Sequence, residues 1–87
     1  MPAVTVKGNG MPTYRVEHIQ GVQGYGEKVI ELFEHVSAFC AMDAIRKVTK
    51  VSGWTAKDHG DTASLFNPEA PNRSEEYCDY YWAELQE

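Results

Sequence analysis

The alternation of side chains over residues 13–20, TYRVEHIQ, is typical of a β-strand. One set of alternate positions holds Tyr14, Val16 and His18, and the other holds Arg15, Glu17 and Ile19. We therefore expect a strand over residues 13–20. The β-prone run before it, residues 3–7, is separated by a Gly-Asn-Gly turn and is expected to form either a short partner strand or a loose tail. Residues 1–12 would then be a loose N-terminal segment.

The next two apolar segments favour a strand followed by a helix. Residues 20–28 contain three glycines and predict a long hairpin loop; they lack the Gly-Lys-Ser/Thr ending of a phosphate-binding loop. The run EKVIELFEHVSA fits both a strand and a helix. A stronger helix pattern follows it, with Ser37 as N-cap and Gly53 as stop. If both segments were helices, the chain would have to break between them at residues 36–38, which include neither Gly nor Pro. The expected elements are therefore a strand over residues 28–36 and a helix over residues 38–51.

The last third of the chain predicts a hairpin and then a helix. Residues 54–66 have β-compatible flanks around His59 and Gly60, which indicates a third strand or a second hairpin turning near Gly60. The breaker-rich segment NPEAPN opens a linker over residues 67–73. Ser74 fits the N-cap of a final helix whose apolar stripe has helical spacing. That stripe consists of Tyr77, Cys78, Tyr81, Trp82 and Leu85.

Together these elements predict a single α+β domain over residues 1–87. The fold class is a small antiparallel sheet of three to four strands packed against a central helix, plus a C-terminal helix. An 87-residue chain buries roughly 60–65% of the surface that it exposes when unfolded, so its stability should be marginal.

The acidic residues are concentrated in the last third of the chain. Residues 1–50 hold six Lys/Arg and five Asp/Glu, whereas residues 51–87 hold two and eight. This distribution disfavours direct nucleic-acid binding by the C-terminal part and favours a basic partner. The apolar windows are too short for a membrane span, and the first residues do not resemble a signal peptide. We therefore expect a cytoplasmic protein.

Catalytic and metal-binding patterns are weak, and we expect no catalytic residues, metal or cofactor. The three histidines are scattered, and Cys40 and Cys78 stand alone as expected reduced thiols. The sequence KDHGDT places His59 between two aspartates, which is typical of a polar turn and matches no metal signature. A basic group on the central helix is expected to be a solvated helix face; it consists of Arg46, Lys47 and Lys50.

A small acidic domain that leads through VSAFCAMDAIRKV into a helix, has a Gly-Trp stop and ends in acids resembles small phage or mobile-element proteins of the anti-CRISPR type. The resemblance covers residues 13–54 and the acidic end, and no specific motif carries it. It implies a non-enzymatic inhibitor that binds a CRISPR effector complex and occupies basic surfaces meant for DNA or guide RNA, in the cytoplasm of a host cell.

The acidic face of the expected C-terminal helix is the candidate partner-binding site. Carboxylates along a rigid helix resemble the phosphates of a nucleic acid, and an exposed Tyr is common in interfaces. The candidate residues are Glu75, Glu76, Asp79, Tyr80 and Glu84. An alternative function is a small structural or assembly protein, a homodimer that buries Tyr14, Phe66 and Trp82. A small enzyme or metal-binding protein is a third alternative.

Overall fold

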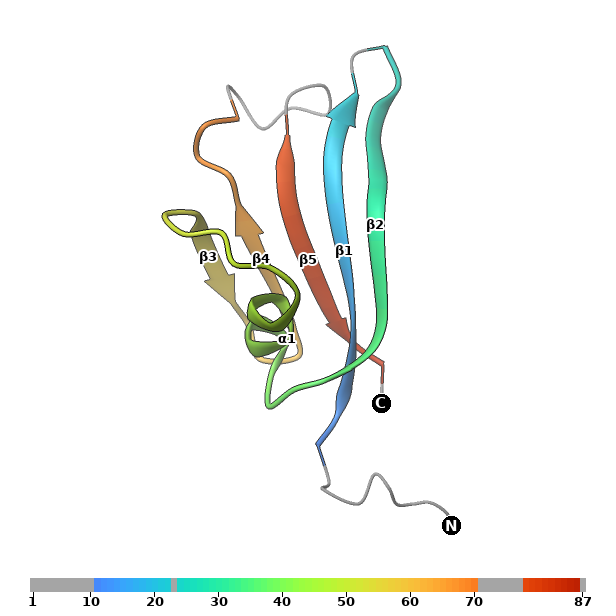
Figure 1. Ribbon diagram of the computed structural model, residues 1–87, viewed down its shortest axis with the longest axis vertical. Coiled ribbons are helices and arrows are strands. Elements are labelled where there is room, and N and C mark those ends of the chain that lie inside the picture. Colours follow the sequence, from blue (N-terminus) through green and yellow to red (C-terminus); the bar gives the residue numbers. More distant parts are fainter. Residues whose placement is uncertain (1–10, 23, 71–77, 87) are drawn as a thin grey trace.

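The computed structural model describes residues 11–22, 24–70 and 78–86. The elements are β1 (Thr13–Val22), β2 (Gly26–Ser37), α1 (Ala41–Val48), β3 (Thr55–Asp58), β4 (Thr62–Phe66) and β5 (Asp79–Leu85). The five strands form one sheet in the order β2-β1-β5-β4-β3, in which all neighbours are antiparallel. Helix α1 crosses one face of this sheet (Figure 1).

The predicted α+β fold, with an antiparallel sheet and a central helix, is confirmed with two corrections. The sheet has five strands where three to four were expected. The prediction of a C-terminal helix is wrong, because Asp79–Leu85 forms strand β5 between β1 and β4. Tyr and Trp residues fit a pleated sheet well, and here both edges of the segment are hydrogen-bonded to other strands. Residues 71–77, where the helix was expected to begin, lie outside the described residues, as do residues 1–10.

Strands β1 and β2 form a long hairpin that turns between Val22 and Gly26. Gly24 and Gly26 both have positive φ values, of 85° and 78°, which glycine adopts at little cost. The two predicted strands are therefore confirmed. Both are longer than expected, because most of the glycine-containing segment predicted as a loop is extended and paired.

Strand β2 is an edge strand interrupted by two bulges. Its register with β1 shifts between Tyr14 and Val16 and again between His18 and Ile19, each time with one extra residue in β2. His35 lies at the first of these shifts with a φ of 58°, and its backbone N–H donates to Oε1 of Gln86 at 2.7 Å. Bulges bend and twist an edge strand, which hinders pairing with a strand of another molecule.

The central helix is shorter than predicted. It runs over eight residues, with Cys40 at the N-cap and Thr49 at the C-cap, whereas residues 38–51 were expected. Ser37 is not the N-cap, since it is the last residue of β2. The carboxylate of Asp43, in the first turn, accepts the backbone N–H of Phe39 at 3.2 Å and so satisfies one group near the helix start. The helix ends because Thr49 is extended, four residues before Gly53.

The hairpin predicted near Gly60 is confirmed as β3–β4. Gly60 has a φ of 82°, and its N–H donates to Oδ1 of Asp58 at 3.0 Å. Asp58 thus stabilises the turn, as an aspartate commonly does. The hairpin places β4 beside β5 and leaves the short β3 at the second edge of the sheet.

The hydrophobic core lies between α1 and one face of the sheet. Its largest fully buried side chains are Ile45 from the helix, Leu65 from β4 and Val16 from β1. Five alanines with no exposed surface let the helix approach the strands closely. They are Ala38, Ala41, Ala44, Ala63 and Ala83.

Candidate binding surface

Strand alternation divides the sheet into a helix face, which contacts α1, and an opposite face that we call the open face. Among the described residues, no helix or second sheet covers the open face, because α1 packs on the other side. Directly paired residues in neighbouring strands share a face, so the strand registers order its side chains into transverse rows. The first row is Thr55, Phe66, Tyr80, Ile19 and Val29; the second is Lys57, Ser64, Trp82, Glu17 and Leu32; the third is Thr62, Glu84 and Arg15.

The first row is built around two stacked aromatic rings. Phe66 and Tyr80 lie 4.8 Å apart between ring centroids with an interplanar angle of 19°. The Tyr80 hydroxyl donates to Oε1 of Glu27 at 3.0 Å, so this side chain extends from β5 across β1 to β2. Burial, and next the hydrogen bond to Glu27, raise the pKa of Tyr80 well above that of a free tyrosine. The phenol is therefore a neutral donor whose ring lies along the sheet.

The indole ring of Trp82, in the second row, is hydrogen-bonded to a charged group of the third row. Nε1–H of Trp82 donates to Oε1 of Glu84 at 3.1 Å. Arg15 lies between two carboxylates, with its Nε 3.7 Å from Glu17 and its Nη2 3.9 Å from Glu84. The side chains of Arg15 and Glu84 remain 39% and 45% exposed. These long ion pairs are weak, and the groups can still contact another molecule.

The aromatic side chains shield the middle of the open face. Ile19 and Ser64 are only 8% and 6% exposed, although they point away from α1. Towards the β2 edge the shielding ends, and Leu32 is 52% exposed. The open face is therefore a surface of aromatic and aliphatic groups, with Glu17 among them and further charged groups at one end and along its margins. Apolar surfaces that contain Tyr and Trp are common in protein interfaces.

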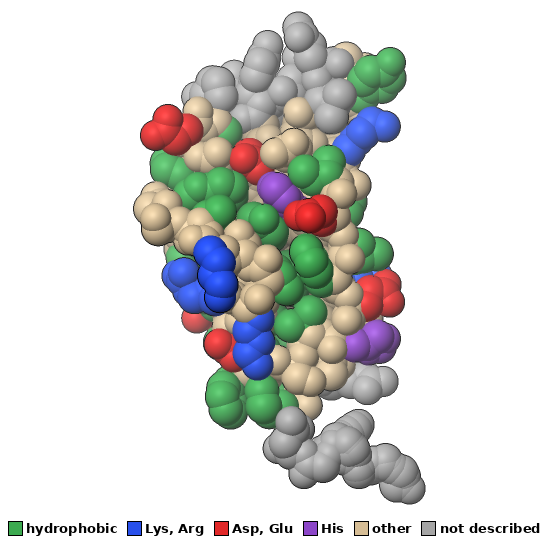
Figure 2. Space-filling model, viewed as in Figure 1, with side chains coloured by type: hydrophobic (Ala, Val, Ile, Leu, Met, Phe, Trp, Pro, Cys, Tyr) green, Lys and Arg blue, Asp and Glu red, His purple; other side chains and the backbone are tan. Residues whose placement is uncertain are grey.

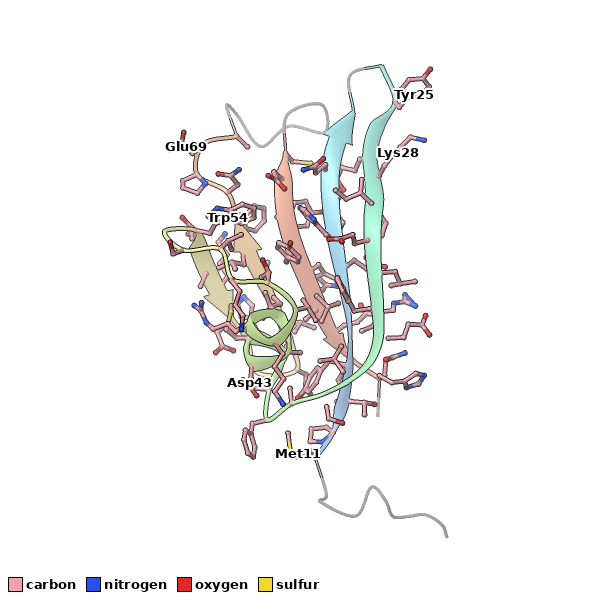
Figure 3. All side chains as sticks on the ribbon, in the orientation of Figure 1. Met11, Tyr25, Lys28, Asp43, Trp54 and Glu69 are labelled. Carbon is pink, nitrogen blue, oxygen red and sulfur yellow. The ribbon has the colours of Figure 1, made fainter. Side chains whose placement is uncertain are left out.

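On the helix face, beyond the end of α1, Asp79 organises a polar network. Its Oδ1 accepts from Nε2 of His18 at 2.8 Å and from Gln20 at 3.4 Å, and its Oδ2 accepts from Asn67 at 3.0 Å. The ring of His18 stacks on Tyr81, with centroids 4.2 Å apart. Figure 3 shows Trp54 in front of the sheet in this region, and its ring lies 5.9 Å from that of Tyr81. The Asp79 carboxylate thus holds β1, β5 and the chain after β4 together.

The structure separates the five predicted partner-binding residues. Tyr80 and Glu84 lie on the open face, but Asp79 lies on the helix face and is engaged within the molecule. Glu75 and Glu76 lie outside the described residues. The prediction that one face of a C-terminal helix brings Asp79, Tyr80 and Glu84 together is therefore wrong. These residues belong to a strand, in which successive side chains point to opposite faces of the sheet.

The residues proposed for a homodimer interface are also divided. Tyr14 is buried in the core at 3% exposure, whereas Phe66 and Trp82 lie on the open face. Sequence reasoning missed the contribution of β1 and β2 to the open face. The alternation that predicted β1 already grouped Arg15, Glu17 and Ile19 on one side, and this was the signal that could have revealed them.

The other candidate groups are distributed over the surface and the core. Arg46, Lys47 and Lys50 are exposed as expected, although Lys50 lies beyond the end of α1, and Figure 2 shows Lys and Arg side chains gathered over the region of α1. Within residues 11–22, 24–70 and 78–86, no group of three or more His, Cys, Asp or Glu side chains is arranged to hold a metal ion. Both cysteines are free thiols, and burial raises the pKa of Cys78. No helix in the described part of the chain is long and apolar enough to cross a membrane.

Comparison of the chain with protein-family models, with curated proteins and with solved structures found no match.

Proposed function

We propose that this protein is a non-enzymatic binding protein that docks onto a protein partner through its open face. The observation that carries the proposal is the stacked Phe66–Tyr80 pair beside Trp82, on a sheet face that no other described element covers. Tyr and Trp supply large contact areas and lose little conformational freedom on binding, which makes them frequent interface anchors. The half-exposed Leu32 extends the apolar contact area to β2.

The charges favour a partner with surplus Lys and Arg. Three carboxylates lie on the open face, from Glu17, Glu27 and Glu84, against the two cations Arg15 and Lys57. The whole chain has a net charge of -5. Basic surfaces of this kind are typical of proteins that bind nucleic acids, so the proposed partner is a nucleic-acid-binding effector complex.

Inhibition is the proposed consequence of docking. A protein that covers a basic groove prevents DNA or RNA from entering it, and it needs no catalytic group. The resemblance to anti-CRISPR-type inhibitors supports this form of the proposal, with a CRISPR effector in the host cytoplasm as the target.

Two charge-introducing variants test the docking surface. Leu32→Lys adds a cation to the open face, whereas Phe39→Lys makes the same kind of change at an exposed hydrophobic residue next to α1, away from that face. Immobilised wild-type protein is expected to capture a nucleic-acid-binding complex from host lysate, identified by mass spectrometry, with less capture as salt rises. Leu32→Lys should lose this capture, and Phe39→Lys should keep it. Equal capture by wild type and Leu32→Lys would refute the open face as the site, and no such complex at low salt would refute the proposed function.

A further inference from the structure

We propose that the open face also binds the open face of a second copy of this chain, forming a reversible face-to-face dimer. Its two-fold axis would run parallel to the strands along the boundary between β1 and β5. This inference concerns the purified protein alone and does not depend on the partner proposed above. It follows from the order in which the open face presents charge and apolar groups.

The third row is self-complementary about this axis. Arg15 in β1 and Glu84 in β5 are directly paired across the boundary between the two strands. A two-fold rotation about that boundary exchanges the two positions, so each Arg15 would face the Glu84 of the second copy. The pair within one chain is long, at 3.9 Å, and both side chains are more than a third exposed. A guanidinium has five N–H donors, so Arg15 can serve a carboxylate of each chain.

In the first row the same rotation places apolar groups against apolar groups, and in the second row it places Glu17 against Trp82 and Leu32 against Ser64. Ile19 in β1 and Tyr80 in β5 are paired across the same boundary, so each position would face the other in the second copy, with the Tyr80 ring above the buried Ile19 supplying the contact. One strand further out, Val29 in β2 would face Phe66 in β4. Glu17 is the one carboxylate in the first two rows, and Arg15 lies 3.7 Å from it. The charge in the middle of the contact is therefore partly balanced.

The architecture favours a second sheet as the cover. Sheets bury an apolar face against a helix or another sheet, and α1 already occupies the opposite side. Pairing through the β2 edge is hindered by its two bulges. Stacking of nucleic-acid bases on the aromatic rings is disfavoured, because the carboxylates on this face outnumber the cations.

The size of the face predicts a weak dimer. About this axis only β2, β1, β5 and β4 face strands of the second copy; four strands spaced at about 4.8 Å and seven residues at about 3.4 Å give a footprint of roughly 450 Å² for each copy. Stable interfaces bury about 800 Å² of accessible surface for each partner. We therefore expect dissociation in the micromolar range or weaker, so that a partner binding the same face competes with the dimer.

Sedimentation equilibrium of the full chain measures dimerisation, and reversing the charge of Arg15 or of Glu84 tests the proposed contact between them. Wild-type protein is expected to shift from monomer to dimer as its concentration rises towards about 1 mM. Arg15→Glu alone and Glu84→Arg alone should each weaken dimerisation roughly 10-fold or more, because like charges then face each other. An equimolar mixture of the two variants should form a heterodimer, since both contacts become complementary. Arg46→Glu, on the exposed side of α1, is the control and should dimerise like wild type.

Circular dichroism of each variant establishes that it is folded. A wild-type protein that stays monomeric at 1 mM would overturn the proposal. A mixture that associates no better than its components would do the same, as would single variants that dimerise like wild type. None of these results depends on capture of a protein partner.

Discussion

At the scale of single residues, Asp79 and Tyr80 show how adjacent side chains take different roles. The Asp79 carboxylate accepts hydrogen bonds from three side chains and connects parts of the chain up to 61 residues apart. Tyr80, the next residue, points to the opposite face and stacks on Phe66. Strand geometry is the cause, because successive Cβ atoms alternate across the sheet. Asp79 therefore stabilises the fold, and Tyr80 contributes to the candidate binding surface.

The raised pKa of Tyr80 predicts a loss of stability in alkali. Burial and the hydrogen bond to Glu27 favour the neutral phenol in the folded state, and burial acts on Tyr14 in the same direction. Both groups ionise first in the unfolded chain, near pH 10, so the folded state binds more protons above that pH. The contribution of these groups to the free energy of unfolding should be fully present below about pH 9 and should decrease as pH rises above about 10.

Urea unfolding at about pH 8 and about pH 10.5 measures this effect. The free energy of unfolding should fall between the two, and Tyr80→Phe should show a smaller fall because only Tyr14 and Cys78, whose pKa values burial also raises, then contribute. An identical fall in Tyr80→Phe and wild type would show that Tyr80 is not responsible.

At the scale of elements, strand β5 determines the structure of the sheet. It joins the β1–β2 hairpin to the β3–β4 hairpin by pairing with β1 on one side and β4 on the other. Its burial pattern has a period of two, with Tyr81 and Ala83 buried against the helix face. The 3.6-residue stripe expected there wrongly grouped Tyr81 with Trp82, whereas the strand places them on opposite faces.

Truncation of these two neighbouring aromatics should therefore have different effects. Tyr81→Ala removes a core side chain that stacks with His18 and contacts Trp54, and it should lower the free energy of unfolding by about 3–5 kcal/mol. Trp82→Ala removes a half-buried open-face side chain and should have a clearly smaller effect on stability. Urea titration of both variants provides the comparison. A greater loss from Trp82→Ala would contradict the assignment of faces.

At the scale of the whole molecule, one helix and one sheet face supply the core. Domains of this size have a net stability of only about 5–10 kcal/mol, so a single core side chain represents a large part of it. Ile45, which has no exposed surface, is the largest fully buried side chain of the helix. Arg46, the next residue in the helix, is exposed to solvent.

Ile45→Ala should lower the free energy of unfolding by about 2–5 kcal/mol, because it removes buried methyl groups and leaves a cavity. Arg46→Ala should change it by no more than about 0.5 kcal/mol. Thermal or urea unfolding of both variants measures the difference. Similar values for the two would show that α1 does not anchor the core.

The sequence alone determined the elements that depend on local chemistry. Alternation predicted β1, and Gly60 marked the β3–β4 turn. Two consecutive helices would have needed a Gly or Pro between them, and the lack of one indicated that strand β2 precedes helix α1. All of these predictions are confirmed. Local patterns also indicated that Arg46, Lys47 and Lys50 are exposed. These features follow from side-chain periodicity and turn residues within a few positions of one another, so no distant contact is needed to specify them.

Only the tertiary structure decided the state and position of residues 79–85. Taken alone, the segment DYYWAEL has apolar residues that fit both a helical and a strand period. Its hydrogen bonds to β1, at the other end of the chain, and to β4 select the strand. That choice sends Asp79 into a polar network and brings Tyr80, Trp82 and Glu84 onto the open face. The candidate binding surface thus depends on pairing between segments distant in sequence, which local periodicity does not encode.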